Sequence, residues 1–402
     1  GKINRMKYIF SILRCYSLTE LMSLIIFKLS KRKRYVYYKK ENTKWAYISY
    51  LPEVFFRQHD DNYLNTHQNK RESLVMGQVF ANNGFNFVVE SFDTVSVDNR
   101  RYDIILGLEP NFCNVAKKNL DALKIYYATG AYYKHQNLMV KVRTDYFNTK
   151  HSCHVPYYRT VIENDAADLA DFIFQIGSKY TLDTYPNRIR PKISLIDQSS
   201  NLYKKISIEQ KLKTYRRNEF LWLGGGGSLL KGLDLVLDYF CQHRELILHV
   251  LGNINQEVND YYSKNLVQCD NIFFHGFVDL NTDTFIHLAE RVTFGIFPSA
   301  SEGAPGAMIA SMKCGIIPIS SKYAAFDDID KLGFMLNNLT IDEIEASVQW
   351  ATQLKPAKIS DMIMENYRYA SKWSLENFAV QFETLLRMKI DTYTREYRDT
   401  KK

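Results

Sequence analysis

Short apolar runs alternate with amphipathic segments along most of the chain, beginning near residue 45. In the first half, strands are predicted at 45–50, 85–90, 102–106, 124–128, 171–176 and 192–196, and helices at 111–120 and 178–184. This alternation is typical of a parallel sheet with helices on both faces. The connections in this half are long and irregular, and residues 130–159 are expected to form a long loop.

The second half alternates more regularly, as in a doubly wound sheet. Strands are predicted at 220–223, 246–251, 272–275, 293–297 and 316–320, and helices at 232–242, 258–267, 282–290 and 306–313. A polar, basic stretch at 201–217 separates the halves. Because 402 residues exceed one ordinary core, we expect an α/β protein with domains at 1–205 and 206–373. Ser374 is a plausible N-cap, and an apolar stripe (Phe378, Phe382, Leu385, Leu386) predicts a last helix within 374–402.

The net charge of +8 is concentrated at the start of the chain. Residues 1–40 contain eleven lysines and arginines and one acid, Glu20, so the remainder is close to neutral. This distribution argues against a general nucleic-acid surface. Residues 18–29 place apolar side chains on one helical face, and Lys31-Arg32-Lys33-Arg34 follow. Two interpretations remain open: an amphipathic helix on an anionic membrane surface, or a packed helix followed by a solvated loop.

No apolar run is long enough to span a bilayer, and the basic cluster follows the apolar segment rather than preceding it as in a signal peptide. The six cysteines are scattered without a CxxC motif, which indicates a reduced, cytoplasmic compartment. His151, Cys153 and His154 are close in sequence, but no second ligand cluster accompanies them. A polar loop with one buried thiol is favoured over a metal site.

Four glycines, Gly224, Gly225, Gly226 and Gly227, follow the strand predicted at 220–223, and Lys231 precedes the next helix. Glycines let a backbone approach a ligand closely, and amides at a strand-to-helix turn bind anions. With its lysine, the turn is suited to a diphosphate. The spacing fits neither a Walker A loop nor a dinucleotide fingerprint. A purely structural glycine turn is the alternative.

Three further strand ends carry candidate ligand groups. Glu302 lies in a turn between a strand and a helix of small residues, beside Ser301, Gly303, Ala304 and Gly306. Asn253 follows the strand at 246–251, and Phe277, Val278 and Asp279 follow the strand at 272–275. Because the carboxyl ends of parallel strands share one sheet edge, these groups are expected to border a single site.

The four segments together resemble the donor-binding half of GT-B glycosyltransferases, in particular the retaining family marked by two glutamates separated by seven residues. The resemblance implies two Rossmann-like domains facing a cleft, with a final helix that returns to the first domain. It implies that Lys231 holds the donor diphosphate and that Glu302 and the amides beside it hold the sugar. It assigns Gly224–Gly227 and Asn253 to donor binding, and Phe277–Asp279 to the base. No cofactor or divalent metal is required.

Two positions depart from this pattern. Position 310, where the second glutamate is expected, is alanine, and position 225, where many relatives have an arginine, is glycine. A lost bond to a charged acceptor costs roughly 1.5–3 kcal/mol if nothing replaces it. Three explanations are open for Ala310: another residue binds the ribose, the donor lacks a ribose 2′-hydroxyl, or donor binding is weak or absent.

The aromatic-rich segment after the strand at 124–128 is expected at the acceptor side, where His135, Gln136 and Arg143 are candidate contacts. The prediction is therefore a glycosyltransferase acting on a saccharide or lipid-linked saccharide acceptor, in cell-surface polysaccharide synthesis at the inner face of a bacterial membrane. The alternatives are a catalytically inactive glycosyltransferase-like partner subunit and a GT-B nucleotide-sugar epimerase. The epimerase would need an acid–base set in the cleft, which the sequence does not display.

Overall fold

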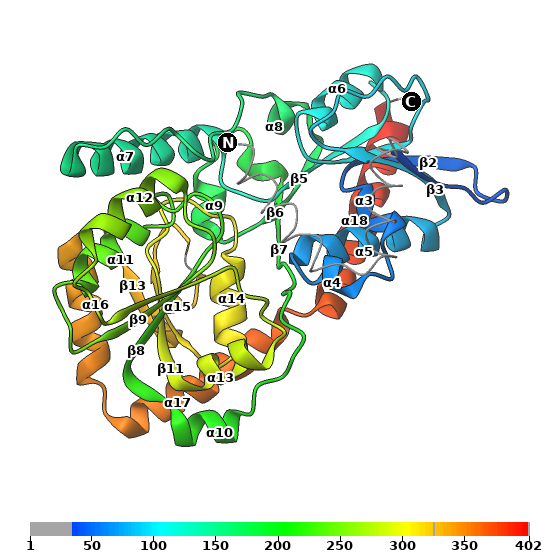
Figure 1. The fold of residues 1–402 in the computed structure, drawn as a ribbon. Helices are drawn as coiled ribbons and strands as arrows, with labels where there is room; N and C mark the ends of the chain where they lie inside the picture. The colour runs from blue at the N-terminus through cyan, green and yellow to red at the C-terminus, as the bar shows by residue number, and fades with distance from the viewer. Residues whose placement is uncertain (1–33, 325, 401–402) are drawn as a thin grey trace, which may run out of the picture.

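A computed structural model describes residues 34–324 and 326–400, with side chains to residue 396. The described chain forms two sheets with helices packed around each (Figure 1). The predicted amphipathic segment 18–29 and most of the basic run after it lie outside the described residues. We call the first sheet with its helices the N-terminal domain and the second sheet with its helices the C-terminal domain.

The first sheet has seven strands in the order β1-β3-β2-β4-β5-β6-β7. All neighbours are parallel except β1, which pairs antiparallel with β3 at one edge. The strands are β1 (Arg34–Tyr37), β2 (Lys44–Tyr50), β3 (Phe85–Ser91), β4 (Ile104–Gly107), β5 (Leu123–Ala128), β6 (Phe172–Ile176) and β7 (Ile193–Ile196). The helices are α3 (Glu53–Phe56), α4 (Asp61–Leu64), α5 (Gln68–Asn82), α6 (Asn111–Lys118), α7 (Tyr133–His151), α8 (Ala166–Leu169) and α9 (Lys179–Asp183).

The second sheet has six parallel strands in the order β10-β9-β8-β11-β12-β13. The strands are β8 (Arg216–Leu223), β9 (Ile247–Leu251), β10 (Ile272–Gly276), β11 (Val292–Phe297), β12 (Ile317–Ser321) and β13 (Phe334–Leu336). The helices are α10 (Ile208–Thr214), α11 (Leu233–Phe240), α12 (Gln256–Asn265), α13 (Asp283–Arg291), α14 (Gly306–Lys313), α15 (Ile329–Leu332), α16 (Ile341–Gln353) and α17 (Pro356–Tyr369). This is the doubly wound α/β architecture predicted from the sequence.

The prediction of a loop at 130–159 is wrong, because most of this stretch is the helix α7. The helix leaves the N-terminal domain after β5 and lies over α11 and α12 of the C-terminal domain (Figure 1). Phe147 of α7 is fully buried in the core of the C-terminal domain, beside side chains of the second sheet. A helix of one domain thus completes the core of the other. The connecting stretch 201–217 is also not all linker, since α10 and the start of β8 lie within it.

The last helix, α18 (Leu375–Thr400), packs against α5 of the N-terminal domain. Its apolar residues Phe378, Phe382 and Leu386 are buried with the side chains of the first sheet, among them Phe174. The ring of Phe382 meets that of Phe174 edge to face. The end of the chain therefore belongs to the N-terminal core, although it follows the C-terminal domain in sequence.

Cys241 and Cys269 form a disulfide, with a Cα–Cα distance of 5.4 Å. This pairing corrects the expectation of reduced thiols throughout. The two residues are 28 positions apart, but α11 ends beside Cys241 and β10 begins just after Cys269. Because α11 leads into β9 and β10 pairs with β9, the fold brings the two thiols together.

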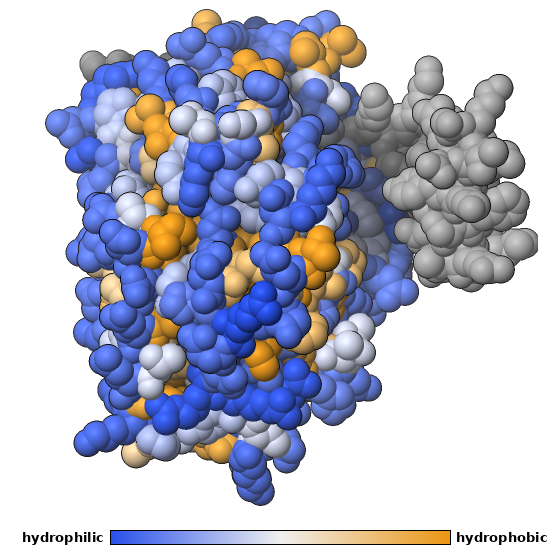
Figure 2. Space-filling view, turned by 60° about the vertical axis from the view of Figure 1, so that its left-hand side comes forward, coloured by the Kyte–Doolittle hydropathy of each residue, from blue (hydrophilic) through white to orange (hydrophobic). Residues whose placement is uncertain are grey.

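Within the described ranges, no helix has both the length and the apolar character needed to traverse a bilayer. In the face shown in Figure 2, hydrophobic residues form small separate spots among hydrophilic ones. This face exposes no broad apolar surface.

Candidate active site

The glycine-rich turn joins β8 to α11 at the carboxyl edge of the second sheet, as predicted. Gly232 begins the helix with φ of +68°, and a Cβ there would lie 2.2 Å from the carbonyl oxygen of Pro298. Only glycine fits this left-handed backbone at so close an approach. The amide of Ala300 donates to the carbonyl of Leu230 at 2.7 Å. The turn after β8 and the turn after β11 are therefore joined into one unit.

Lys231 and Glu302, the two predicted central residues, form an ion pair across these turns. The Lys231 Nζ lies 2.6 Å from Glu302 Oε1, and the Ser299 hydroxyl donates to the same oxygen at 3.3 Å. Both charged side chains are mostly buried, with 17% and 14% exposed. The Trp222 indole donates to the Lys231 carbonyl and supports the turn from below. A cation and a carboxylate thus lie side by side at the carboxyl edge of the second sheet.

The donor-side residues predicted after β9 and β10 border the same edge. Gly252 follows β9 with φ of +119°, and its amide donates to the carbonyl of Gly276 at 2.7 Å. Next to it, Asn253 is exposed. After β10, the Phe277 ring is 63% exposed, Val278 is partly buried and Asp279 accepts from the amide of Asn281. An exposed aromatic ring at this edge suits a planar ligand.

The turn around Glu302 faces the N-terminal domain directly. A Cβ on Gly303 would lie 2.5 Å from the carbonyl oxygen of Thr129 and 2.6 Å from that of Ile176, at the ends of β5 and β6. A Cβ on Gly306 would lie 3.2 Å from Gln198 Nε2. Ala304 packs against the N-terminal core, and the hydroxyl of Ser301 is buried without a partner in the described part of the chain. The site is therefore a contact zone between the two domains.

The two departures from the family pattern have different surroundings. Ala310 on α14 is fully buried in an apolar cluster that includes Leu221, Leu251 and Leu202. A carboxylate at this position would be surrounded by hydrocarbon, so alanine suits the packing. At Gly225 and Gly226, by contrast, no atom lies within 4 Å of a built Cβ. The turn is open on the side where a ligand would approach.

The three predicted acceptor-side residues have different roles. His135 lies against the rings of Tyr180 and Tyr323, and its buried Nε2 has no partner within the described residues. Burial lowers the pKa of this imidazole below its usual value. Gln136 is buried and donates to the carbonyl of Arg159 at 2.9 Å.

Arg143 is not available to an acceptor, which corrects the prediction. Its guanidinium makes two 2.6 Å contacts with the carboxylate of Asp234 on α11, and both side chains are almost completely buried. The pair joins α7 of the N-terminal domain to the C-terminal domain. No sequence motif marks this pair, because the partners are 91 residues apart.

The structure also brings together buried polar groups of the N-terminal core that the sequence analysis missed. Tyr50 lies at the end of β2 and Tyr127 near the end of β5, on either side of β4, with ring centroids 5.5 Å apart. The Tyr127 hydroxyl is buried without a partner among the described residues. Behind them, Glu72 of α5 accepts from the amide and hydroxyl of Ser199 at 2.6 and 2.8 Å. Burial raises the pKa of Glu72 to about 7. No sequence motif marks these residues, because their proximity depends on how α5 packs.

His67 and Arg159 also face the turn that carries Lys231. Desolvation lowers the pKa of His67, the N-cap of α5, and the charges of Lys70, Lys231 and Arg159 lower it further. A Cβ on Gly227 would lie 2.7 Å from Cγ of Arg159. Arg159 itself has φ of +69°, which is uncommon for a residue other than glycine. Cations from both domains therefore gather at this turn.

The cluster around His151 does not form a metal site. The Nδ1 atom of His151 forms a 2.7 Å hydrogen bond with the Tyr261 hydroxyl, and its Nε2 lies 3.2 Å from Oδ2 of Asp238. Cys153 is a partly buried free thiol. Over the ranges 34–324 and 326–400, no three potential ligands gather around a common point. The absence of a required metal stays a prediction.

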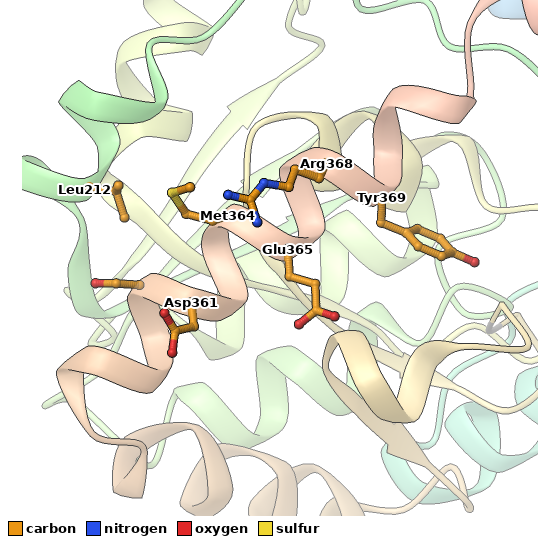
Figure 3. A pocket seen from close by; sticks show the side chains of 7 residues that line it. Leu212, Asp361, Met364, Glu365, Arg368 and Tyr369 are labelled. Atoms are coloured by element: carbon orange, nitrogen blue, oxygen red, sulfur yellow. The ribbon is translucent and has the colours of Figure 1, made fainter.

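A separate pocket of about 720 Å³ lies between α10 and α17 (Figure 3). It is lined by Leu212, Ser360, Asp361, Met364, Glu365, Arg368 and Tyr369. Because α10 leads into the amino end of β8, the pocket is near the opposite edge of the sheet from the glycine-rich turn. It contains none of the predicted site residues.

Comparison with known proteins identifies the fold. No family model matches the sequence, and no curated protein is detectably similar to it. Among solved structures, Anabaena Alr3699/HepE in complex with UDP shares 12% identity at a TM-score of 0.55, over 86% of this chain and 100% of that one. WaaG, a glycosyltransferase involved in lipopolysaccharide biosynthesis, shares 13% identity at a TM-score of 0.52, over 85% of this chain and 99% of that one.

Sucrose-phosphate synthase from Thermosynechococcus elongatus shares 13% identity at a TM-score of 0.53, over 87% of this chain and 99% of that one. The pneumococcal O-GlcNAc transferase GtfA shares 14% identity at 0.50, and this chain spans only 57% of its length. The likeness to these proteins is one of fold, because the identities are only 12–14%. The chain described here has the GT-B fold of glycosyltransferases.

Proposed function

We propose that the protein transfers a sugar from a nucleotide-sugar donor to a saccharide or lipid-linked saccharide acceptor. The observation that carries this proposal is the placement of Lys231 and Glu302. Both lie at the carboxyl edge of the second sheet, next to an open glycine turn and opposite the N-terminal domain. In open α/β sheets, ligands bind at this edge.

In this proposal, the amides of the glycine turn and Lys231 neutralise the departing diphosphate, and no metal is needed for that role. Glu302 and the amides of Gly303 and Ala304 bind the sugar hydroxyls. The exposed Phe277 and the turn after it contact the base. Catalysis then consists mainly of positioning the two substrates and stabilising the charge that develops. Retention of the anomeric configuration is proposed from the family resemblance.

The comparisons support UDP as the first nucleotide to test, because HepE and GtfA were solved with UDP. WaaG acts in lipopolysaccharide synthesis, which is compatible with a lipid-linked acceptor and a role in cell-surface polysaccharides. The proposed acceptor side is the segment of α7 that carries His135, which is only partly buried and lies against the rings of Tyr180 and Tyr323. These aromatic rings and the polar imidazole match the mixed apolar and hydroxylated faces of a sugar.

A thermal-shift panel of UDP-, GDP-, dTDP- and CMP-sugars tests the proposal. One member should raise the melting temperature of the wild type, and Lys231→Ala should abolish that rise. Lys264→Ala, on the exposed surface of α12, is the matched control and should leave it unchanged. A panel without any stabilising nucleotide would refute donor binding. Preference for dTDP over UDP would support a donor that lacks the ribose 2′-hydroxyl.

A catalytically inactive partner subunit is the second candidate, and the apolar surroundings of Ala310 favour it. An inactive subunit could retain the fold while losing the ribose contact. The two candidates differ in turnover: a transferase hydrolyses or transfers the donor sugar slowly even without its natural acceptor. Release of nucleoside diphosphate from the stabilising donor, abolished by Lys231→Ala, would exclude the inactive subunit.

We also propose that residues 1–40 bind the protein to the anionic inner face of the membrane, as expected from their charge. Flotation with anionic and neutral liposomes tests this. The full chain should float only with anionic vesicles, and a chain lacking residues 1–33 should remain at the bottom. Equal flotation of the shortened chain would contradict the proposal.

A further inference from the structure

The diphosphate site on the C-terminal domain is short of positive charge. Its one lysine, Lys231, is already neutralised by Glu302 at 2.6 Å. Each phosphoryl group of a nucleotide sugar carries a negative charge at neutral pH. Position 225, where many relatives of the resembling family have an arginine, is glycine and contributes no side chain. A diphosphate bound there needs a further cation.

Arg159 is the candidate cation, and it belongs to the other domain. It lies between α7 and α8, yet its side chain runs along Gly227 of the glycine turn, with Cγ 2.7 Å and Cδ 3.5 Å from a built Cβ. The absence of a side chain at Gly227 is what makes room for it. Gly227 also has φ of +86°, so glycine is required there on two counts.

The backbone holds Arg159 in place from the N-terminal side. Gln136 of α7 donates to its carbonyl at 2.9 Å, and Asn137 exchanges two 2.8 Å hydrogen bonds with Val161. Arg159 has a left-handed backbone conformation, which costs about 1 kcal/mol or more and persists where the surroundings impose it. Such positions are concentrated at binding sites.

The guanidinium is free to bind an anion. Arg159 is exposed, and no carboxylate among the described residues forms an ion pair with it. Arg159 lies against Gly227, whose carbonyl accepts from the amide of Lys231 at 3.0 Å, so both cations border the same turn. A guanidinium binds phosphate oxygens through paired, charge-assisted hydrogen bonds.

We propose that Arg159 binds the donor diphosphate from the N-terminal domain, replacing the cation absent at position 225. The inference rests on the proposed donor binding at Lys231. Its consequence is that the diphosphate is held by both domains at once.

Titration calorimetry on the full chain first gives the dissociation constants of UDP, GDP and dTDP for the wild type. The nucleotide that binds most tightly is then used with the variants. Arg159→Gln should weaken the binding of that nucleotide roughly 10-fold to 100-fold, which is the loss of affinity expected for a charge-assisted hydrogen bond. Arg387→Gln, at an exposed ion pair with Glu383 on α18, is the control and should bind as the wild type does. Melting temperatures without nucleotide should agree among all three proteins.

A second variant separates charge from structure. Gly225→Arg should restore affinity in the Arg159→Gln background, because no atom lies near position 225 and its φ is not left-handed. Equal affinity of Arg159→Gln and Arg387→Gln would overturn the inference while leaving the proposed function intact. A loss of affinity in Arg159→Gln that Gly225→Arg does not reverse would also overturn the inference, because Arg159 would then act only through the fold. Failure of the wild type to bind any of the nucleotides would refute the proposed function itself.

Discussion

Replacing Arg143 with methionine should destabilise the protein strongly, through the carboxylate that it leaves behind. In the structure, both oxygens of Asp234 accept from the Arg143 guanidinium at 2.6 Å, and the two side chains are 3% and 0% exposed. Without the guanidinium, a buried carboxylate has neither a counter-ion nor solvent. Breaking such a pair from one side costs about 3–5 kcal/mol.

Urea unfolding followed by circular dichroism gives the free energy of unfolding for Arg143→Met, Asp234→Leu and the double variant. The double variant should lose much less free energy of unfolding than the two single variants lose together, because no uncompensated charge remains. Arg188→Met is the control, since its ion pair with Asp168 is exposed and should be worth about 0–1 kcal/mol. A loss for Arg143→Met no larger than that of the control, or additive single losses, would refute this account of the interdomain pair.

Three further predictions concern buried positions. Glu72→Gln should raise the free energy of unfolding by roughly 3 kcal/mol above pH 7, because the buried carboxyl has its pKa raised from 4.5 to about 7. The gain should shrink as the pH falls toward 4.5 in a pH series of urea melts; a pH-independent difference would contradict it. Phe147→Ala should cost about 3–5 kcal/mol in the same assay, since its ring fills the C-terminal core; a loss below 1 kcal/mol would show that α7 packs elsewhere. Gly303→Ala should lower the melting temperature, because its Cβ would meet the carbonyls of Thr129 and Ile176, whereas Gly130→Ala, with free space, should not.

The strand and turn chemistry of the C-terminal domain could be predicted because it is local. Each strand there is a short apolar run, and each glycine turn follows it directly, so one segment contains the whole signal. The helix α14 begins at Gly306 and ends at Lys313, the bounds predicted from the sequence. The ion pair of Lys231 with Glu302 follows from the same rule, because both residues occupy strand ends at one edge of a parallel sheet.

The helix α7 was missed because its buried face is not apolar. The buried positions, Gln136, Val140, Arg143, Thr144 and Phe147, have helical spacing, but three of the five are polar. Gln136 is satisfied by its hydrogen bond to Arg159 and Arg143 by its ion pair with Asp234, 23 and 91 positions away. A search for apolar periodicity cannot recognise a face whose burial depends on such partners.

The sequence by itself determined the two-sheet α/β class, the glycine turns and the positions of Lys231 and Glu302, because these depend on apolar runs and on residues adjacent in the chain. The tertiary structure alone decided that Arg143 pairs with Asp234, that Cys241 meets Cys269 and that Arg159 reaches the glycine turn. Each of these contacts joins residues tens of positions apart. Their partners are selected by the packing of α7, α11 and the two sheets, and packing is a property of the whole folded chain.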